Sequence, residues 1–116
     1  MAGYDESAKL FKTLMHPARL EILEILRDGE HCVCHIEAAS GYRQAYISQQ
    51  LSVLREAGLV QDRRDGWNIY YRVAQPRVFD VFDAAQAMTG EKRNRRKPAV
   101  DNCSCPQCSP IETVAA

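Results

Sequence analysis

The sequence predicts a mostly helical α+β domain of about five helices and one two-stranded β-hairpin. Three observations predict this fold class. Apolar residues recur at intervals of three and four between residues 5 and 57, which is the period of an α-helix. An Asp65-Gly66 pair separates two runs of β-forming residues, which is typical of a hairpin. The 116 residues show no internal repeat, so a single domain is expected.

The first two helices are predicted over residues 5–15 and 17–28. His16-Pro17 separates them, because proline suits the first turn of a helix, where its missing N–H costs nothing. Asp28-Gly29 ends the second helix. Two more helices are expected over residues 32–39 and 44–57, joined by a tight turn at Gly41. Such a pair is a helix-turn-helix, whose second helix enters the major groove of DNA.

Residues 59–63 and 67–73 are predicted to be the two strands of the hairpin. A hairpin directly after a helix-turn-helix is a wing. The alternating aromatic residues Trp67, Tyr70 and Tyr71 are expected to pack the wing rather than to stack on single-stranded nucleic acid. A last helix is predicted over residues 75–88. Residues 1–90 are therefore expected to form a winged helix-turn-helix domain, and residues 91–116 a flexible, basic, cysteine-containing tail.

Composition and charge disfavour several functions. Fifteen basic and fifteen acidic residues give zero formal net charge, which argues against a purely electrostatic DNA binder but not against a sequence-reading one. No apolar run approaches the ~20 residues needed to cross a bilayer. The first residues show no signal peptide, so a cytoplasmic protein is expected. A small thiol enzyme or metal-handling protein is the alternative from another class. No nucleophile–base pair stands at a recognisable spacing, so we expect no enzyme.

Four segments carry a family resemblance: residues 14–23 (LMHPARLEIL), 32–34 (CVC), 47–60 (ISQQLSVLREAGLV) and 70–73 (YYRV). Over about residues 8–88 the chain resembles the arsenic-repressor (ArsR/SmtB) family of metal-sensing repressors. The resemblance implies a homodimer paired through its first and last helices. It also implies binding to double-stranded operator DNA with inverted-repeat symmetry, and release when an inducer ion binds.

The predicted reading helix carries polar side chains on its early, outward part. Glutamine pairs well with adenine, and arginine with guanine or phosphate. Arg63 and Arg64, with Asn68, are expected to hold phosphates or the minor groove. Gln50 stands where the family often has histidine. A solvated surface is the alternative interpretation of all these residues. The candidate DNA-binding residues are Arg43, Gln44, Tyr46, Ser48, Gln49, Gln50, Arg63 and Arg64.

The cysteine pattern indicates metal or redox chemistry. The count is odd and no secretion signal is present, so a disulfide framework is not expected. Three sulfurs suit trivalent arsenic or antimony, and also lead, cadmium or mercury. The CVC segment favours arsenite, and no organic cofactor is expected. The tail cysteines have no evident core to join. The candidate ligands are Cys32, Cys34, Cys103, Cys105 and Cys108.

Two ligand arrangements stay open. Helical residues two apart point about 200° away from each other, so Cys32 and Cys34 can share an ion only if the first turn is open. Opening that turn would strain the third helix, which supports the reading helix. A helix N-terminus also favours the thiolate form of cysteine. In the arsenic-responsive members, a third cysteine stands where this chain has Glu37. Either Cys32 and Cys34 join tail cysteines of the same or the partner subunit, or the three tail cysteines bind an ion alone.

Three alternatives compete with the arsenic hypothesis. His31 and His35, four residues apart, could bind zinc or cadmium with a nearby cysteine. Oxidant or persulfide could instead join Cys32 or Cys34 to a tail cysteine. Cys32 and Cys34 could also be small buried hydrophobic residues with no ligand. The zinc site that the family has on the last helix is not expected, because that helix offers only Asp80 and Asp83 and no histidine.

Overall fold

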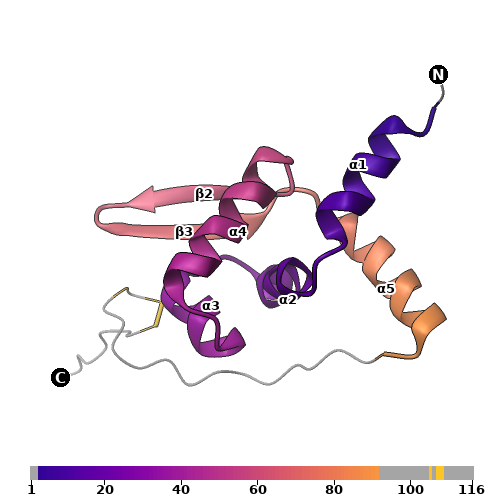
Figure 1. Ribbon diagram of the computed structural model, residues 1–116. Helices are drawn as coiled ribbons and strands as arrows, with labels where there is room; N and C mark the ends of the chain where they lie inside the picture. Colours follow the sequence, from indigo (N-terminus) through magenta and orange to yellow (C-terminus); the bar gives the residue numbers. More distant parts are fainter. Residues whose placement is uncertain (1–2, 92–104, 106, 109–116) are drawn as a thin grey trace.

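The structure, a computed structural model, describes residues 3–91, 105, 107 and 108. It confirms the winged helix-turn-helix fold, with the expected helices and hairpin at the expected places (Figure 1). The helices are α1 (Asp5–Leu14), α2 (Pro17–Ile25), α3 (Val33–Ser40), α4 (Gln44–Glu56) and α5 (Val78–Thr89). The strands are β1 (His31–Cys32), β2 (Val60–Asp65) and β3 (Asn68–Val73). A short 3₁₀ turn, Leu26–Asp28, continues α2.

The sheet has one strand more than the sequence predicts. Its order is β1-β3-β2, and both pairs are antiparallel. In β1, His31 lies opposite Tyr71 and Cys32 lies opposite Tyr70. A two-residue strand carries no readable period, so the sequence could not reveal it. Its presence means that Cys32 ends a strand and does not begin the third helix.

The tip of the wing also differs from the prediction. Asp65 pairs with Asn68, so the two-residue turn is Gly66-Trp67 and not Asp65-Gly66. Gly66, at φ 65°, takes the first central position, where a type II′ turn favours glycine. Trp67 is 99% exposed, so the expectation that it packs the wing is wrong. Tyr70 is buried, as expected.

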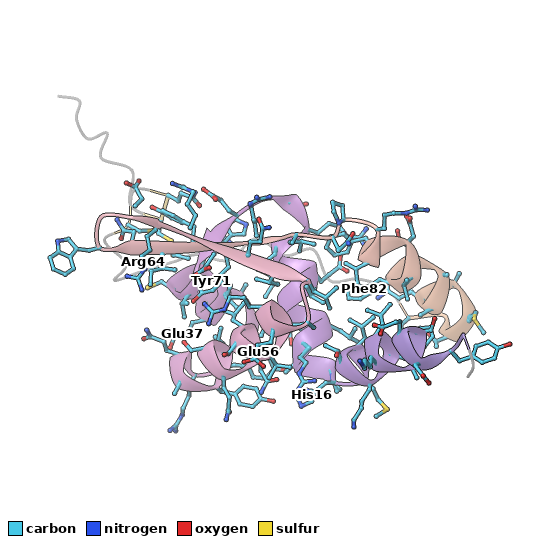
Figure 2. The ribbon with its side chains drawn as sticks, turned by 90° about the horizontal axis from the view of Figure 1, so that it is seen from above. His16, Glu37, Glu56, Arg64, Tyr71 and Phe82 are labelled. Carbon is cyan, nitrogen blue, oxygen red and sulfur yellow. The ribbon has the colours of Figure 1, made fainter. Side chains whose placement is uncertain are left out.

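The main core fixes the orientation of α4. Ile47, Leu51 and Leu54 face inward at the predicted spacing of four and three, and each is essentially inaccessible. Burying a side chain of this kind stabilises a fold by about 1.5–3 kcal/mol. The opposite face of α4 is therefore presented to solvent. The buried residues of this core are Leu14, Ile22, Leu23, Leu26, Ile36, Ile47, Leu51, Leu54, Leu59, Val60, Val78 and Phe82 (Phe82 is labelled in Figure 2).

A polar contact ties α4 to the first two helices. Arg19 Nε donates a hydrogen bond of 2.8 Å to Gln50 Oε1, and Arg19 Nη1 donates one of 3.1 Å to the carbonyl of Thr13. Gln50 is buried, at 6% exposure. This side chain is thus turned inward, away from the exposed face of the helix on which the sequence analysis placed it.

We predict that Gln50→Ala destabilises the fold by about 1–3 kcal/mol, because the partly buried Arg19 Nε–H then loses its acceptor. Urea unfolding of the variant measures the change. Gln49→Ala is the matched control, since Gln49 is exposed one position earlier and is expected to change stability by less than about 0.5 kcal/mol. Equal stabilities of the two variants would contradict the role assigned to the Arg19–Gln50 bond.

Candidate functional site

Three cysteine sulfurs from distant parts of the chain meet beside the sheet. The Sγ atom of Cys32 lies 3.3 Å from Sγ of Cys105 and 3.3 Å from Sγ of Cys108. All three sulfurs lie within 4.8 Å of one another. Cys32 and Cys105 are buried, and Cys108 is partly buried. We call these three residues the sulfur cluster.

Local backbone geometry brings these sulfurs together. Cys32 precedes α3 in an extended conformation, with φ −83° and ψ 171°, and ends strand β1. On the other side, the N–H of Cys108 donates a 3.1 Å hydrogen bond to the carbonyl of Cys105, which closes a turn. This turn lies beside the start of α3 (Figure 1).

The remaining two cysteines stand differently. Cys34 lies in the first turn of α3 and packs against the sulfur cluster, but its sulfur is not one of the three that meet. Cys103 lies outside the described residues. The expectation that tail cysteines have no core to join is wrong for Cys105, which is 2% exposed in a small second core with Cys32 and Tyr70. The pairing of β1 with β3 creates that core.

The spacing of the sulfur cluster fits a shared thiophilic ion. A metal–sulfur bond of about 2.3 Å places two sulfurs on one ion about 3.3–4 Å apart. The two distances of 3.3 Å from Cys32 already lie at the short end of that range. Three sulfur donors without nitrogen or oxygen suit soft ions, including trivalent arsenic and antimony and divalent lead and cadmium.

The histidines beside Cys32 are arranged differently. The rings of His31 and His35 stack, with centroids 3.7 Å apart and planes within 3° of parallel. Imidazole lone pairs lie in the ring plane, so an ion shared by both rings would stand well outside each plane. This stack does not favour a zinc site there. Burial, and then the neighbouring His35, lower the pKa of His31 to about 4, and burial lowers the pKa of His35 as well.

We predict that the ion-free protein loses stability as pH falls from 6.5 to about 4. In this window the unfolded chain binds a proton at His31 while the folded chain does not, so protons favour unfolding. Urea unfolding across this pH range measures the slope. His31→Gln is expected to flatten it relative to the parent protein. An identical slope in the variant would show that this ring is not held neutral by the fold.

The sequence analysis did not connect Tyr70, Arg63 or Glu30 with the cysteines. Tyr70 contacts the sulfur cluster, and burial followed by the neighbouring Cys105 raises the pKa of Tyr70. The guanidinium of Arg63 lies 4.8 Å from the centre of the Tyr70 ring and is hydrogen-bonded to Glu30 through both Nε and Nη2. Once the hairpin turn is fixed at Gly66-Trp67, the register places Arg63 opposite Tyr70. That turn was the sequence signal that could have found this pair.

The structure places the candidate DNA-reading residues on two elements, α4 with its N-cap and strand β2. Arg43 is the N-cap of α4, in an extended conformation. Arg63 and Arg64 are neighbours on β2, opposite Tyr70 and Ile69, so their side chains lie on opposite faces of the hairpin. Arg64 is labelled on the wing in Figure 2. The exposed candidates of the α4 region are Arg43, Gln44, Tyr46, Ser48 and Gln49.

No helix in the described part of the chain has the length and apolar character needed to span a membrane.

On the last helix, Asp83 accepts a hydrogen bond of 2.9 Å from Arg27, and Asp80 lies 3.8 Å from Arg77. Both carboxylates that the sequence analysis weighed as zinc ligands therefore stand in ion pairs.

Comparisons with known proteins identify the family. Residues 16–62 match the family described as "Bacterial regulatory protein, arsR family". The chain is 46% identical over 83 residues to the biofilm growth-associated repressor of Agrobacterium fabrum, covering 72% of this chain and 71% of that protein. The crystal structure of the transcriptional repressor BigR from Xylella fastidiosa superposes with a TM-score of 0.70 at 38% identity, covering 76% of this chain and 90% of that one.

A solution structure from Mycobacterium bovis is also similar, with a TM-score of 0.66 at 34% identity over 83% of this chain and 96% of that one. It is described as a homodimeric winged helix-turn-helix DNA-binding domain. The relatives named here are regulators and not enzymes, in agreement with the expectation from the sequence. The chain belongs to the arsR family of bacterial regulatory proteins, and it is a transcriptional regulator with a winged helix-turn-helix DNA-binding fold.

Proposed function

We propose that this regulator is a homodimeric repressor that leaves its operator when arsenite or antimonite binds to Cys32, Cys105 and Cys108. The observation that carries this proposal is the meeting of three sulfurs, two of them buried, at the start of α3. Cadmium, lead and zinc are the alternative ions. Zinc is disfavoured because it prefers four ligands and the nearby histidines stack on each other.

The surface around α4 supports DNA reading. Gln44, Ser48 and Gln49 are exposed on the helix that the core holds with its other face inward. The positive end of the helix dipole, together with Arg43, favours contact with phosphate at the start of α4. Arg64 on the wing supplies a further charge for the backbone. The proposed reading set leaves out Gln50, which holds Arg19 inside the fold.

Exposed apolar residues support the dimer. Figure 1 shows α1 and α5 at the end of the molecule away from the hairpin turn. Phe11, Met15 and Met88, on or beside these helices, are 58%, 75% and 87% exposed. Large exposed apolar side chains gathered at one end of a small domain mark an interaction surface. A second copy of the chain is the proposed occupant, as in the homodimeric relative from M. bovis.

The proposed capture reaction needs no oxidant. Three thiols displace the three hydroxyls of arsenous acid, As(OH)₃, giving three arsenic–sulfur bonds and three waters while arsenic stays trivalent. Cys32 precedes α3 directly, and Ile36 of α3 packs in the same core as Ile47 of α4. A shift of Cys32 on ion capture therefore reaches the reading helix through α3. This is the proposed route from ion to DNA release.

A DNA-binding titration tests the proposal. Reduced protein is bound to fluorescent duplex DNA from upstream of its own gene and titrated with arsenite, antimonite, cadmium, lead and zinc. We expect arsenite and antimonite to release the DNA at about one ion per subunit. Retention of the DNA at saturating concentrations of every ion would overturn the proposed sensing function. DNA binding without any ion tests the repressor function separately.

The contacts of Cys32 favour one second candidate, a redox trigger. Its sulfur lies 3.3 Å from two other sulfurs, so a small movement would allow a disulfide to either. Two thiols and one hydrogen peroxide give one disulfide and two waters. Under this alternative, peroxide releases the DNA and the intact mass falls by the two lost hydrogens. DNA release by arsenite with no effect of peroxide would exclude it.

A further inference from the structure

A straight row of side chains connects the sulfur cluster to the wing. Cys32 in β1 lies opposite Tyr70 in β3, and Tyr70 lies opposite Arg63 in β2. Residues directly opposite one another in a sheet share a face, so these three side chains are consecutive neighbours. The guanidinium of Arg63 lies over the Tyr70 ring, whose other contacts include Cys105. The cluster is therefore two side-chain contacts away from a candidate DNA-binding residue.

A second set of contacts connects the tail cysteines to Arg63, through Gln107 and Glu30. Gln107, between the two tail cysteines of the cluster, donates a 3.3 Å hydrogen bond from Nε2 to Oε1 of Glu30. Glu30 accepts hydrogen bonds from Arg63 Nε, at 3.2 Å, and from Nη2. The Arg63 side chain is 49% exposed and that of Glu30 is 24% exposed. Arg63 can therefore be reached by another anion only in competition with Glu30.

We infer that Glu30 competes with a DNA phosphate for Arg63, and that ion capture by Cys105 and Cys108, on either side of Gln107, tips this competition toward Glu30. Gln107 contacts Glu30 and Cys105 packs against Tyr70, so an ion bound by Cys105 and Cys108 would fix both contacts and hold the carboxylate and the ring that engage Arg63. Ion capture then removes a positive charge of each wing from the DNA backbone. This inference rests on the proposed function and adds to it a route through the wing, separate from the route through α3.

The expected size of the effect follows from the exposure of the pair. An exposed ion pair changes an equilibrium by up to about fivefold, and we take about threefold for each wing. A dimer with two wings then gives about tenfold in the dissociation constant for DNA. The path is reciprocal, so bound DNA weakens ion binding by the same factor.

The test is the ion response of DNA affinity in two variants of the full, reduced protein, Glu30→Gln and Arg63→Ala. The response is the ratio of the dissociation constants for DNA with and without saturating arsenite. We expect Glu30→Gln to lower this ratio about tenfold relative to the parent protein, because Arg63 stays available to phosphate in the presence of the ion. Arg63→Ala is expected to lower the ratio similarly, because no guanidinium is left to withdraw.

Two matched controls separate this path from a general change of charge. Asp62→Asn removes one negative charge, as Glu30→Gln does, but from strand β2. Asp62 pairs with Arg55 and lies outside the row Cys32–Tyr70–Arg63. Arg64→Ala removes the neighbouring guanidinium on the other face of the hairpin. Both are expected to change DNA affinity while keeping the parent ratio within about twofold. Arsenite stoichiometry and circular dichroism verify that each variant folds and binds the ion.

The salt dependence of binding gives an independent readout. Each lost phosphate contact lowers the slope of log Kd against log salt by about 0.9. Ion-loaded parent protein is expected to show a smaller slope than ion-loaded Glu30→Gln. If arsenite raises the dissociation constant of the parent protein strongly, and Glu30→Gln shows the same increase and the same salt slope, this inference is overturned. The proposed function is then still supported. A parent ratio near one overturns the proposed function, and this inference falls with it.

Discussion

Cys32→Ser is expected to abolish arsenite-triggered release while leaving ion-free DNA binding close to that of the parent protein. Cys32 is the sulfur that lies 3.3 Å from both other members of the cluster, so its loss removes the centre of the site. Removing a residue that only supports a metal ligand typically weakens metal binding about 10–100-fold. Removing a ligand itself costs more, so we expect at least about 100-fold weaker ion binding. Isothermal titration with arsenite measures this change.

Cys34→Ser is the matched control for this prediction. Cys34 lies two residues away and packs against the cluster without contributing one of the three sulfurs. We expect this variant to bind arsenite within about fivefold of the parent protein. Equal losses in Cys32→Ser and Cys34→Ser would show that the ion site includes both residues, as the alternative arrangement from the sequence proposes.

Gln49→Ala is expected to weaken binding to the operator about 100-fold. A glutamine that reads adenine contributes about 1–3 kcal/mol, and a dimer on an inverted repeat uses two copies. Fluorescence anisotropy on operator DNA measures the loss. Binding to unrelated duplex DNA should change by less than about threefold, because phosphate contacts are kept.

The control for this prediction is the neighbouring residue. Gln50 is buried against Arg19, so Gln50→Ala is expected to act on stability and not directly on base reading. At a temperature where both variants are fully folded, Gln50→Ala should keep operator affinity within about fivefold of the parent protein. Unchanged operator affinity in Gln49→Ala would remove Gln49 from the reading set.

The elements with strong local signals could be predicted from the sequence. Apolar spacing defines α4, and Gly58, just past its last turn, takes the positive φ of 79° that suits such a position. The Asp-Gly signal indicated the hairpin but shifted its turn by one residue, since Gly66 takes the first central position. Turn chemistry locates a hairpin more reliably than it sets the register.

The candidate site could be predicted only in part. The cysteine pattern left two arrangements open, a mixed site of Cys32 and Cys34 with tail cysteines and a site of the three tail cysteines alone. Cys32 could not be separated from Cys34 without strand β1. That strand depends on pairing with β3, which lies 38 residues further along at Tyr70. Glu30 and Gln107 belong to no motif, because their importance comes only from long-range contacts, of Glu30 with Arg63 and of Gln107 with Glu30. Non-local pairing of this kind leaves no period in the sequence.

The central claim is that Cys32, Cys105 and Cys108 take up the ion together. Alkylation of the reduced, full-length protein with and without arsenite, followed by peptide mass spectrometry, tests it residue by residue. We predict that arsenite protects these three cysteines and leaves the alkylation of Cys34 and Cys103 unchanged. Protection of Cys103 with continued alkylation of Cys32 would contradict the account.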